Sequence, residues 1–147
     1  MGLFDFVGEI GKKIFAKKEE ASQAVTDHIA QDNPGVENVA VTVEDGVAKL
    51  EGKAASAEAL EKAILMAGNV VGINAVNVDK VSIQNGETLA GDDEFYVIQK
   101  GDTLWKIAEK TYGNGAKYSA IVTANKEVIK DADKIFPGQK IRLPKSL

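Results

Sequence analysis

A polar, glycine-bearing stretch from Gln84 to Asp93 divides the 147-residue chain into two unequal parts. Amides, acids and a hydroxyl residue surround Gly86 and Gly91 there, which is typical of a linker. A chain of this length suits small domains. The sequence therefore predicts an α+β protein with two small domains, in residues 1–86 and 95–147, joined by a linker in residues 87–94.

The first part combines helix and strand patterns. Apolar residues share one side of a helix that is predicted over residues 19–31. Valines at positions 39, 41 and 43 then alternate with polar residues, as in a half-buried strand. Asp45-Gly46 is a hairpin signal and predicts a return strand over residues 47–52.

A second helix and a third strand complete this part. The side chain of Ser56 can cap the helix. We expect Gly68 to end the helix in the left-handed conformation. Val76 and Val78 then alternate in a strand that runs to about residue 83. The order is helix, strand, strand, helix, strand.

The first residues carry a further helical pattern over residues 3–15, followed by lysines. Two interpretations stay open: this helix docks on its own domain, or it lies on a membrane surface. Asp5 and Glu9 interrupt the basic face and count against the membrane.

Composition excludes several functions. The chain has no cysteine and one histidine, His28, and no nucleophile–base set occurs, so we expect no catalytic activity. Residues 1–88 carry 14 acids and 8 lysines, which disfavours nucleic acid as a partner. No apolar run is long enough for a membrane span, and the start lacks the pattern of a secretory signal. A cytoplasmic monomer is expected.

The second part reads as a strand from residue 95 to 99, a helix opening near Thr103, a helix over residues 116–125 and a strand over residues 140–143. Several motifs follow one another in this part: Tyr96-Val97-Ile98, Gly101-Asp102-Thr103-Leu104-Trp105-Lys106-Ile107-Ala108, Tyr112-Gly113, Ala124-Asn125 and Ile135-Phe136-Pro137-Gly138-Gln139-Lys140-Ile141-Arg142-Leu143-Pro144. Through these motifs it resembles the LysM family, which implies a β-α-α-β fold.

The LysM resemblance implies a groove for polymers of N-acetylglucosamine. The matching positions are Asp102, Thr103, Leu104, Ile135 and Pro137. Several of these residues are also needed for the turns and the core, so a purely structural role stays open. The alternative function that follows is a carbohydrate-binding adaptor at the cell envelope.

The first part resembles the BON domain, through Val47-Ala48-Lys49-Leu50-Glu51-Gly52 and Ala67-Gly68-Asn69-Val70-Val71-Gly72-Ile73. The whole chain, with its Met-Gly-Leu-Phe start, is similar to the small bacterial cytoplasmic potassium-binding proteins. That resemblance implies a potassium ion held by backbone carbonyls at Val7, Ile10, Gly68, Val70 and Ile73. Ile10 departs from the small residue expected there, which a carbonyl ligand tolerates.

The chemistry of this implied site is consistent with the residues. Potassium is large and weakly hydrated, and rings of carbonyls can replace its water shell, whereas clustered carboxylates favour calcium or magnesium. Gly68 and Gly72 would let carbonyls converge. From the residues alone, an ordinary helix stop and turn explain these glycines equally well. The hypothesis is a potassium sensor or buffer; a scaffold whose BON domain and first helix contact a membrane or protein partner is a further alternative.

Overall fold

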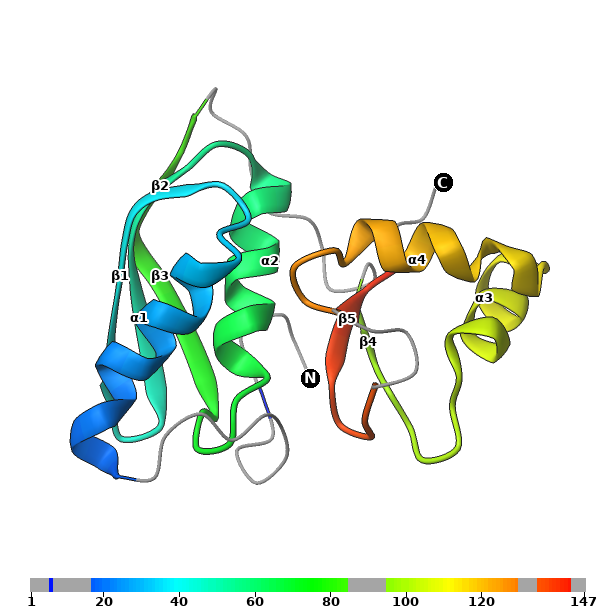
Figure 1. Cartoon of the computed structure of the whole chain (residues 1–147), viewed down its shortest axis with the longest axis horizontal. Helices are drawn as coiled ribbons and strands as arrows, with labels where there is room; N and C mark the ends of the chain where they lie inside the picture. The colour runs from blue at the N-terminus through cyan, green and yellow to red at the C-terminus, as the bar shows by residue number, and fades with distance from the viewer. Residues whose placement is uncertain (1–5, 7–16, 85–94, 130–134, 144–147) are drawn as a thin grey trace.

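The computed structural model describes residue 6 and residues 17–84, 95–129 and 135–143. Most of the first predicted helix, residues 7–15 included, and the linker of residues 87–94 lie outside the described residues. The described part contains both helices and strands and forms two domains (Figure 1), which confirms the α+β class. In this part of the chain no helix has both the length and the apolar character needed to cross a bilayer.

The N-terminal domain begins with the short 3-10 helix η1 (Lys18–Glu20), which leads into α1 (Ala21–Gln31). Strands β1 (Val36–Glu44) and β2 (Val47–Ala54) form the predicted hairpin, and α2 (Ala57–Gly68) and β3 (Ala75–Ile83) follow. The sheet order is β1-β2-β3, with β1 antiparallel and β3 parallel to β2. Because parallel neighbours need a crossover connection, α2 spans the sheet between β2 and β3.

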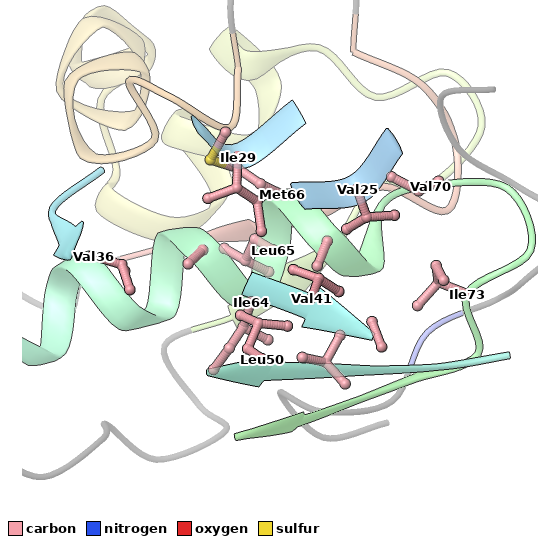
Figure 2. Close-up of a cluster of buried hydrophobic side chains, with 14 of the residues drawn as sticks. Val25, Ile29, Val36, Val41, Leu50, Ile64, Leu65, Met66, Val70 and Ile73 are labelled. Atoms are coloured by element: carbon pink, nitrogen blue, oxygen red, sulfur yellow. The ribbon is translucent and has the colours of Figure 1, made fainter. Parts of the chain in front are cut away.

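Helix α1 lies along β1 and protects its backbone. The hydroxyl oxygens of Ser22 and Thr26 accept hydrogen bonds from the backbone N–H groups of Val43 and Val41, at 2.8 and 2.9 Å. Since an edge strand otherwise exposes unpaired polar groups, these two bonds close one edge of the sheet. Apolar side chains of α1, α2 and the sheet form the core of this domain (Figure 2).

The C-terminal domain is built from β4 (Phe95–Val97), α3 (Leu104–Tyr112), the 3-10 helix η4 (Gly115–Lys117), α4 (Tyr118–Ala124) and β5 (Lys140–Arg142). The two strands pair antiparallel. A second apolar cluster includes side chains of α3, α4 and β5, so this domain has its own core. The predicted strand–helix–helix–strand order is confirmed.

Both predicted helix caps are present. The side-chain oxygen of Ser56 accepts from the N–H of Ala59 at 3.1 Å, and that of Thr103 accepts from the N–H of Lys106 at 3.1 Å. Each bond satisfies one of the unpaired donors at a helix start. The hairpin turn is also as expected, because Asp45 and Gly46 have φ of 50° and 78°, as a type I′ turn requires.

Helix α2 is enclosed on both sides (Figure 1). Every residue from Ala59 to Gly68 is buried, including the charged Glu61 and Lys62. One side of the helix packs into the N-terminal core, and Phe95 and Val128 of the other part of the chain pack against that core as well. Because Val128 also packs against the C-terminal core, the two cores meet beside α2.

Candidate functional site

Three of the five candidate ion-binding residues lie at the end of α2 and in the loop that joins it to β3. Gly68 is the last residue of α2, and Val70 and Ile73 follow within the loop. The side chains of Val70 and Ile73 are fully buried and belong to the same apolar cluster as Val25 and Val41 (Figure 2). The side chains therefore anchor this loop in the core, and its backbone is what can face a ligand.

Val7 and Ile10, the other two predicted ligand residues, lie outside the described residues. Their neighbour Phe6 is described and is buried. The backbone N–H of Phe6 donates to the carbonyl of Asn74, just after the loop, at 2.9 Å. The chain immediately before Val7 is thereby attached to the same end of α2.

The conformation expected for Gly68 is wrong. Gly68 is helical and has no positive φ, and the residue that caps the helix is Asn69, with φ −82° and ψ 36°. Glycine is required here for space: a Cβ atom on Gly68 would overlap the ring of Phe6. Gly68 thus serves the contact between α2 and the N-terminal segment.

The loop itself is closed by short-range hydrogen bonds. The N–H of Ile73 donates to the carbonyl of Val70 at 3.1 Å, and the N–H of Asn74 donates to the carbonyl of Gly46 in the hairpin turn at 2.7 Å. Gly72 has φ of 101°, a conformation that side chains disfavour. This positive φ explains why a glycine stands at this position of the turn.

The C-terminal domain contacts both parts of this region through one residue, Lys140. The side-chain amide of Asn69 donates to the carbonyl of Lys140 at 2.8 Å and accepts from its N–H at 2.9 Å. The ammonium of Lys140 lies 4.3 Å from the centre of the Phe6 ring, within the range of a cation–π interaction. Lys140 is only 1% exposed, so the junction of Phe6, Asn69 and Lys140 is buried.

Charged pairs join the two domains further along α2. Arg142 Nε donates to Glu61 Oε2 at 3.0 Å, and Lys62 Nζ donates to Glu127 Oε1 at 3.0 Å. The exposed fractions of these side chains range from 3% for Glu61 to 16% for Glu127. Buried charges are costly unless they are paired, and each charge that the contact between the domains buries on α2 has a partner of opposite sign in the C-terminal domain.

The electrostatic character of the loop suits a neutral-oxygen site. Among the described residues, no group of three or more His, Asp or Glu side chains is placed to hold a metal ion. The last carbonyls of α2 lie at the negative end of the helix dipole and lack partners further along a regular helix. A cation bound here would be held by main-chain oxygens.

Four of the five candidate carbohydrate-binding residues have structural roles within the C-terminal domain. Asp102 Oδ2 accepts from the hydroxyl of Tyr96 at 2.5 Å and from the N–H of Gln99 at 2.8 Å. Thr103 caps α3, Leu104 is buried, Ile135 packs against the core and Pro137 is exposed.

The Tyr96–Asp102 pair shifts the pKa of both groups. Burial, the hydrogen bond to Asp102 and the charge of Asp102 raise the pKa of Tyr96 to about 12. The hydrogen bond from Tyr96 is the largest influence and lowers the pKa of Asp102; burial opposes it, and the Gln99 N–H and the charges of Lys110 and Lys106 add to the lowering. The carboxylate is therefore an ionised component of the turn before α3.

Sequence reasoning missed the residues that join the two domains. Asn69 and Lys140 appeared only as parts of the BON-like and LysM-like motifs. Glu61 and Lys62 interrupt an otherwise apolar helix, which was the available signal. Their partners, Glu127 and Arg142, lie more than 60 residues away, so spacing could not identify them.

Comparisons with known proteins match this architecture. Residues 17–85 match the BON domain family, and residues 96–144 match the LysM domain family. The potassium binding protein Kbp of Escherichia coli O6:H1 is 36% identical over 151 residues, which cover 98% of this chain and 99% of that protein.

Two other relatives share shorter regions. An uncharacterized protein of Deinococcus radiodurans is 35% identical over 102 residues, which are 65% of this chain and 40% of that protein. The uncharacterized protein YqbP of Bacillus subtilis is 40% identical over 58 residues, which are 33% of this chain and 26% of that protein.

Proposed function

The chain belongs to the family of BON and LysM proteins that includes the potassium binding protein Kbp, and we propose that it too binds a potassium ion. The proposed ligands are backbone carbonyls of Val7 and Ile10 in the N-terminal segment and of Gly68, Val70 and Ile73 in the loop after α2. The observation that carries the proposal is the attachment of Phe6 to both ends of this loop, at Gly68 and Asn74.

The surroundings of the loop favour potassium over harder cations. Val70 and Ile73 bury apolar side chains, so the polar groups that the loop can offer to an ion are its carbonyls. Neutral carbonyl oxygens replace the water shell of potassium, whereas magnesium and calcium prefer carboxylates. The end of α2 adds a negative potential without a fixed charge.

The proposed role is that of a potassium sensor or buffer without catalytic activity. An ion that binds only when the N-terminal segment lies against the loop stabilises that arrangement by mass action. The carbohydrate-binding alternative has less support, because Asp102, Thr103 and Leu104 are engaged within their own domain. The cytoplasmic location and the monomeric state remain predictions.

Calorimetry on the full chain tests whether the protein binds potassium in preference to sodium. Protein in buffer free of both potassium and sodium is titrated with each chloride salt. We expect saturable heat with potassium and markedly weaker binding of sodium. Equal heats for the two salts, or none, would contradict the proposal.

NMR of the backbone carbonyl carbons tests whether the proposed ligand residues contact the ion. Addition of potassium should shift the carbonyl carbon resonances of Gly68, Val70 and Ile73 more than those of Thr103 and Leu104 in the C-terminal domain. Potassium binding without these shifts would place the ion elsewhere.

A further inference from the structure

Strand β5 has an outer edge that faces away from β4. Two asparagine side chains form hydrogen bonds with the backbone groups of this edge. Asn125 donates to the carbonyl of Arg142 at 2.8 Å and accepts from its N–H at 2.7 Å. Asn69 makes the same pair of bonds to Lys140, at 2.8 and 2.9 Å. Because residues two apart in a strand direct their backbone groups to the same edge, both amides serve one side of β5.

The two asparagines come from different domains. Asn125 follows α4 within the LysM domain, whereas Asn69 belongs to the BON domain and directly follows Gly68 in the proposed ion loop. Asn69 is 8% exposed, and its backbone N–H still donates to Leu65 as the helix cap. Its side chain is therefore committed entirely to the LysM strand.

We infer that Asn69 is a positioning residue through which the LysM domain fixes the backbone of the Gly68–Ile73 loop, and thereby its preference among alkali cations. The inference rests on the proposed potassium function. Asn69 lies between Gly68 and Val70, which are both proposed ligand residues. A rotation of the backbone at Asn69 would therefore move their carbonyls and change the size of the proposed ring of oxygens around the ion.

The contact of Lys140 with Phe6 supports this role. One LysM residue holds Asn69 through its backbone and lies over Phe6, the neighbour of Val7, through its ammonium. The loop after α2 and the segment at Phe6, which carry the two parts of the proposed carbonyl ring, therefore both contact Lys140 of β5. A shared support limits how the two parts can move relative to each other, and both the size of a carbonyl ring and the number of carbonyls that reach the ion affect discrimination between potassium and the smaller sodium ion.

The test compares Asn69→Ala with Asn125→Ala in the full chain. Neither substitution changes the charge, and each removes a pair of bonds to β5. Asn69→Ala removes the pair to Lys140, and Asn125→Ala removes the pair to Arg142 together with the bond to the Ile121 carbonyl. Only Asn69→Ala acts on the loop. We expect Asn69→Ala to raise the potassium Kd about tenfold and to reduce the ratio of potassium to sodium affinity. Asn125→Ala should destabilise the LysM domain and leave that ratio unchanged.

Two further variants keep the test decisive if either alanine variant folds poorly. Asn69→Ser retains a polar group that is too short to reach both groups of Lys140, and should show the same loss of preference. Val128→Ala weakens the packing between the cores without removing any bond to the loop, and serves as the alternative control.

Amide hydrogen exchange in ion-free buffer gives a readout that does not depend on potassium. The N–H of Ile73 is bonded to Val70, and its exchange should accelerate in Asn69→Ala beyond any change in the control variants. Equal exchange and an equal ion preference in the Asn69 and control variants would overturn the inference. If the unaltered protein binds no potassium, the proposed function fails, and the exchange comparison alone decides whether Asn69 positions the loop.

Discussion

The loop after α2 and the turn before α3 were both predicted to face a ligand, and they use their residues in opposite ways. In the turn, Asp102 and Thr103 direct their side chains at their own backbone. In the loop, Val70 and Ile73 bury their side chains in the core, and Asn69 pairs with another domain. Whether side chains are available to bind a ligand can be judged from the hydrogen bonds they already make. In a site built from backbone carbonyls, the side chains are not ligands and can instead hold the backbone in place.

The largest expected effect comes from Gly68→Ala. The added methyl group would displace the ring of Phe6, and overpacking of this kind costs about 1–3 kcal/mol of unfolding free energy. Because Phe6 precedes Val7, we also expect the potassium Kd to rise at least about tenfold. Urea unfolding and calorimetry measure the two effects.

Gly101→Ala is the matched control in the LysM domain. Gly101 has φ of 87° and open space around the position of a Cβ, so alanine brings backbone strain of about 1–2 kcal/mol and no overlap. Potassium affinity should not change. Equal losses of affinity in the two alanine variants would remove the distinction between loop and turn.

Thr103→Ala should have a smaller effect. Loss of the cap of α3 is expected to reduce stability by about 1 kcal/mol and to leave the potassium Kd within about twofold. Ser56→Ala removes the equivalent cap of α2, at the end of that helix remote from the loop. We expect it to cause a similar loss of stability and a similarly small change in the potassium Kd. Abolition of potassium binding by Thr103→Ala alone would show that the turn belongs to the ion site.

The effect expected to be smallest near neutral pH is a pH dependence of the turn. The folded pKa of Tyr96, about 12, exceeds its ordinary value of 10.0, so the stabilisation is complete below pH 10 and is lost between pH 10 and about 12. The pKa of Asp102 is lowered, so its contribution is present above its usual pKa of 3.8 and is lost as the pH falls through the folded value.

Tyr96→Phe should abolish the alkaline loss attributed to Tyr96 and weaken the acid loss, because the hydrogen bond that most lowers the pKa of Asp102 is gone. Unfolding midpoints measured across pH give both limits. Tyr112→Phe is the control, since burial raises the pKa of this second tyrosine, which lies outside the turn. The same alkaline profile in Tyr96→Phe and the unaltered protein would show that the pair does not stabilise the turn.

Local patterns predicted most of the helices and strands, because helix caps, turns and the alternation of apolar and polar residues in strands depend on residues that are close in sequence. Ser56, Asp45-Gly46 and Thr103 all do what their position in the sequence suggested. Gly68 shows the limit of such patterns. A glycine at a helix end usually relieves backbone strain, but here it admits a ring from a residue 62 positions earlier. The bonds of Asn69 to Lys140 depend on the docking of two domains, which no local pattern records.

The burial of α2 between two cores has a practical consequence for dissecting the protein. A break in the chain between residues 84 and 95 would produce two fragments with complementary surfaces, one carrying Glu61 and Lys62 and the other Arg142 and Glu127. The covalent connection raises the effective concentration of one fragment for the other. Separated fragments would therefore depend on their own concentration to reassemble, and a reporter split at this position would respond to whatever strengthens the contact between them.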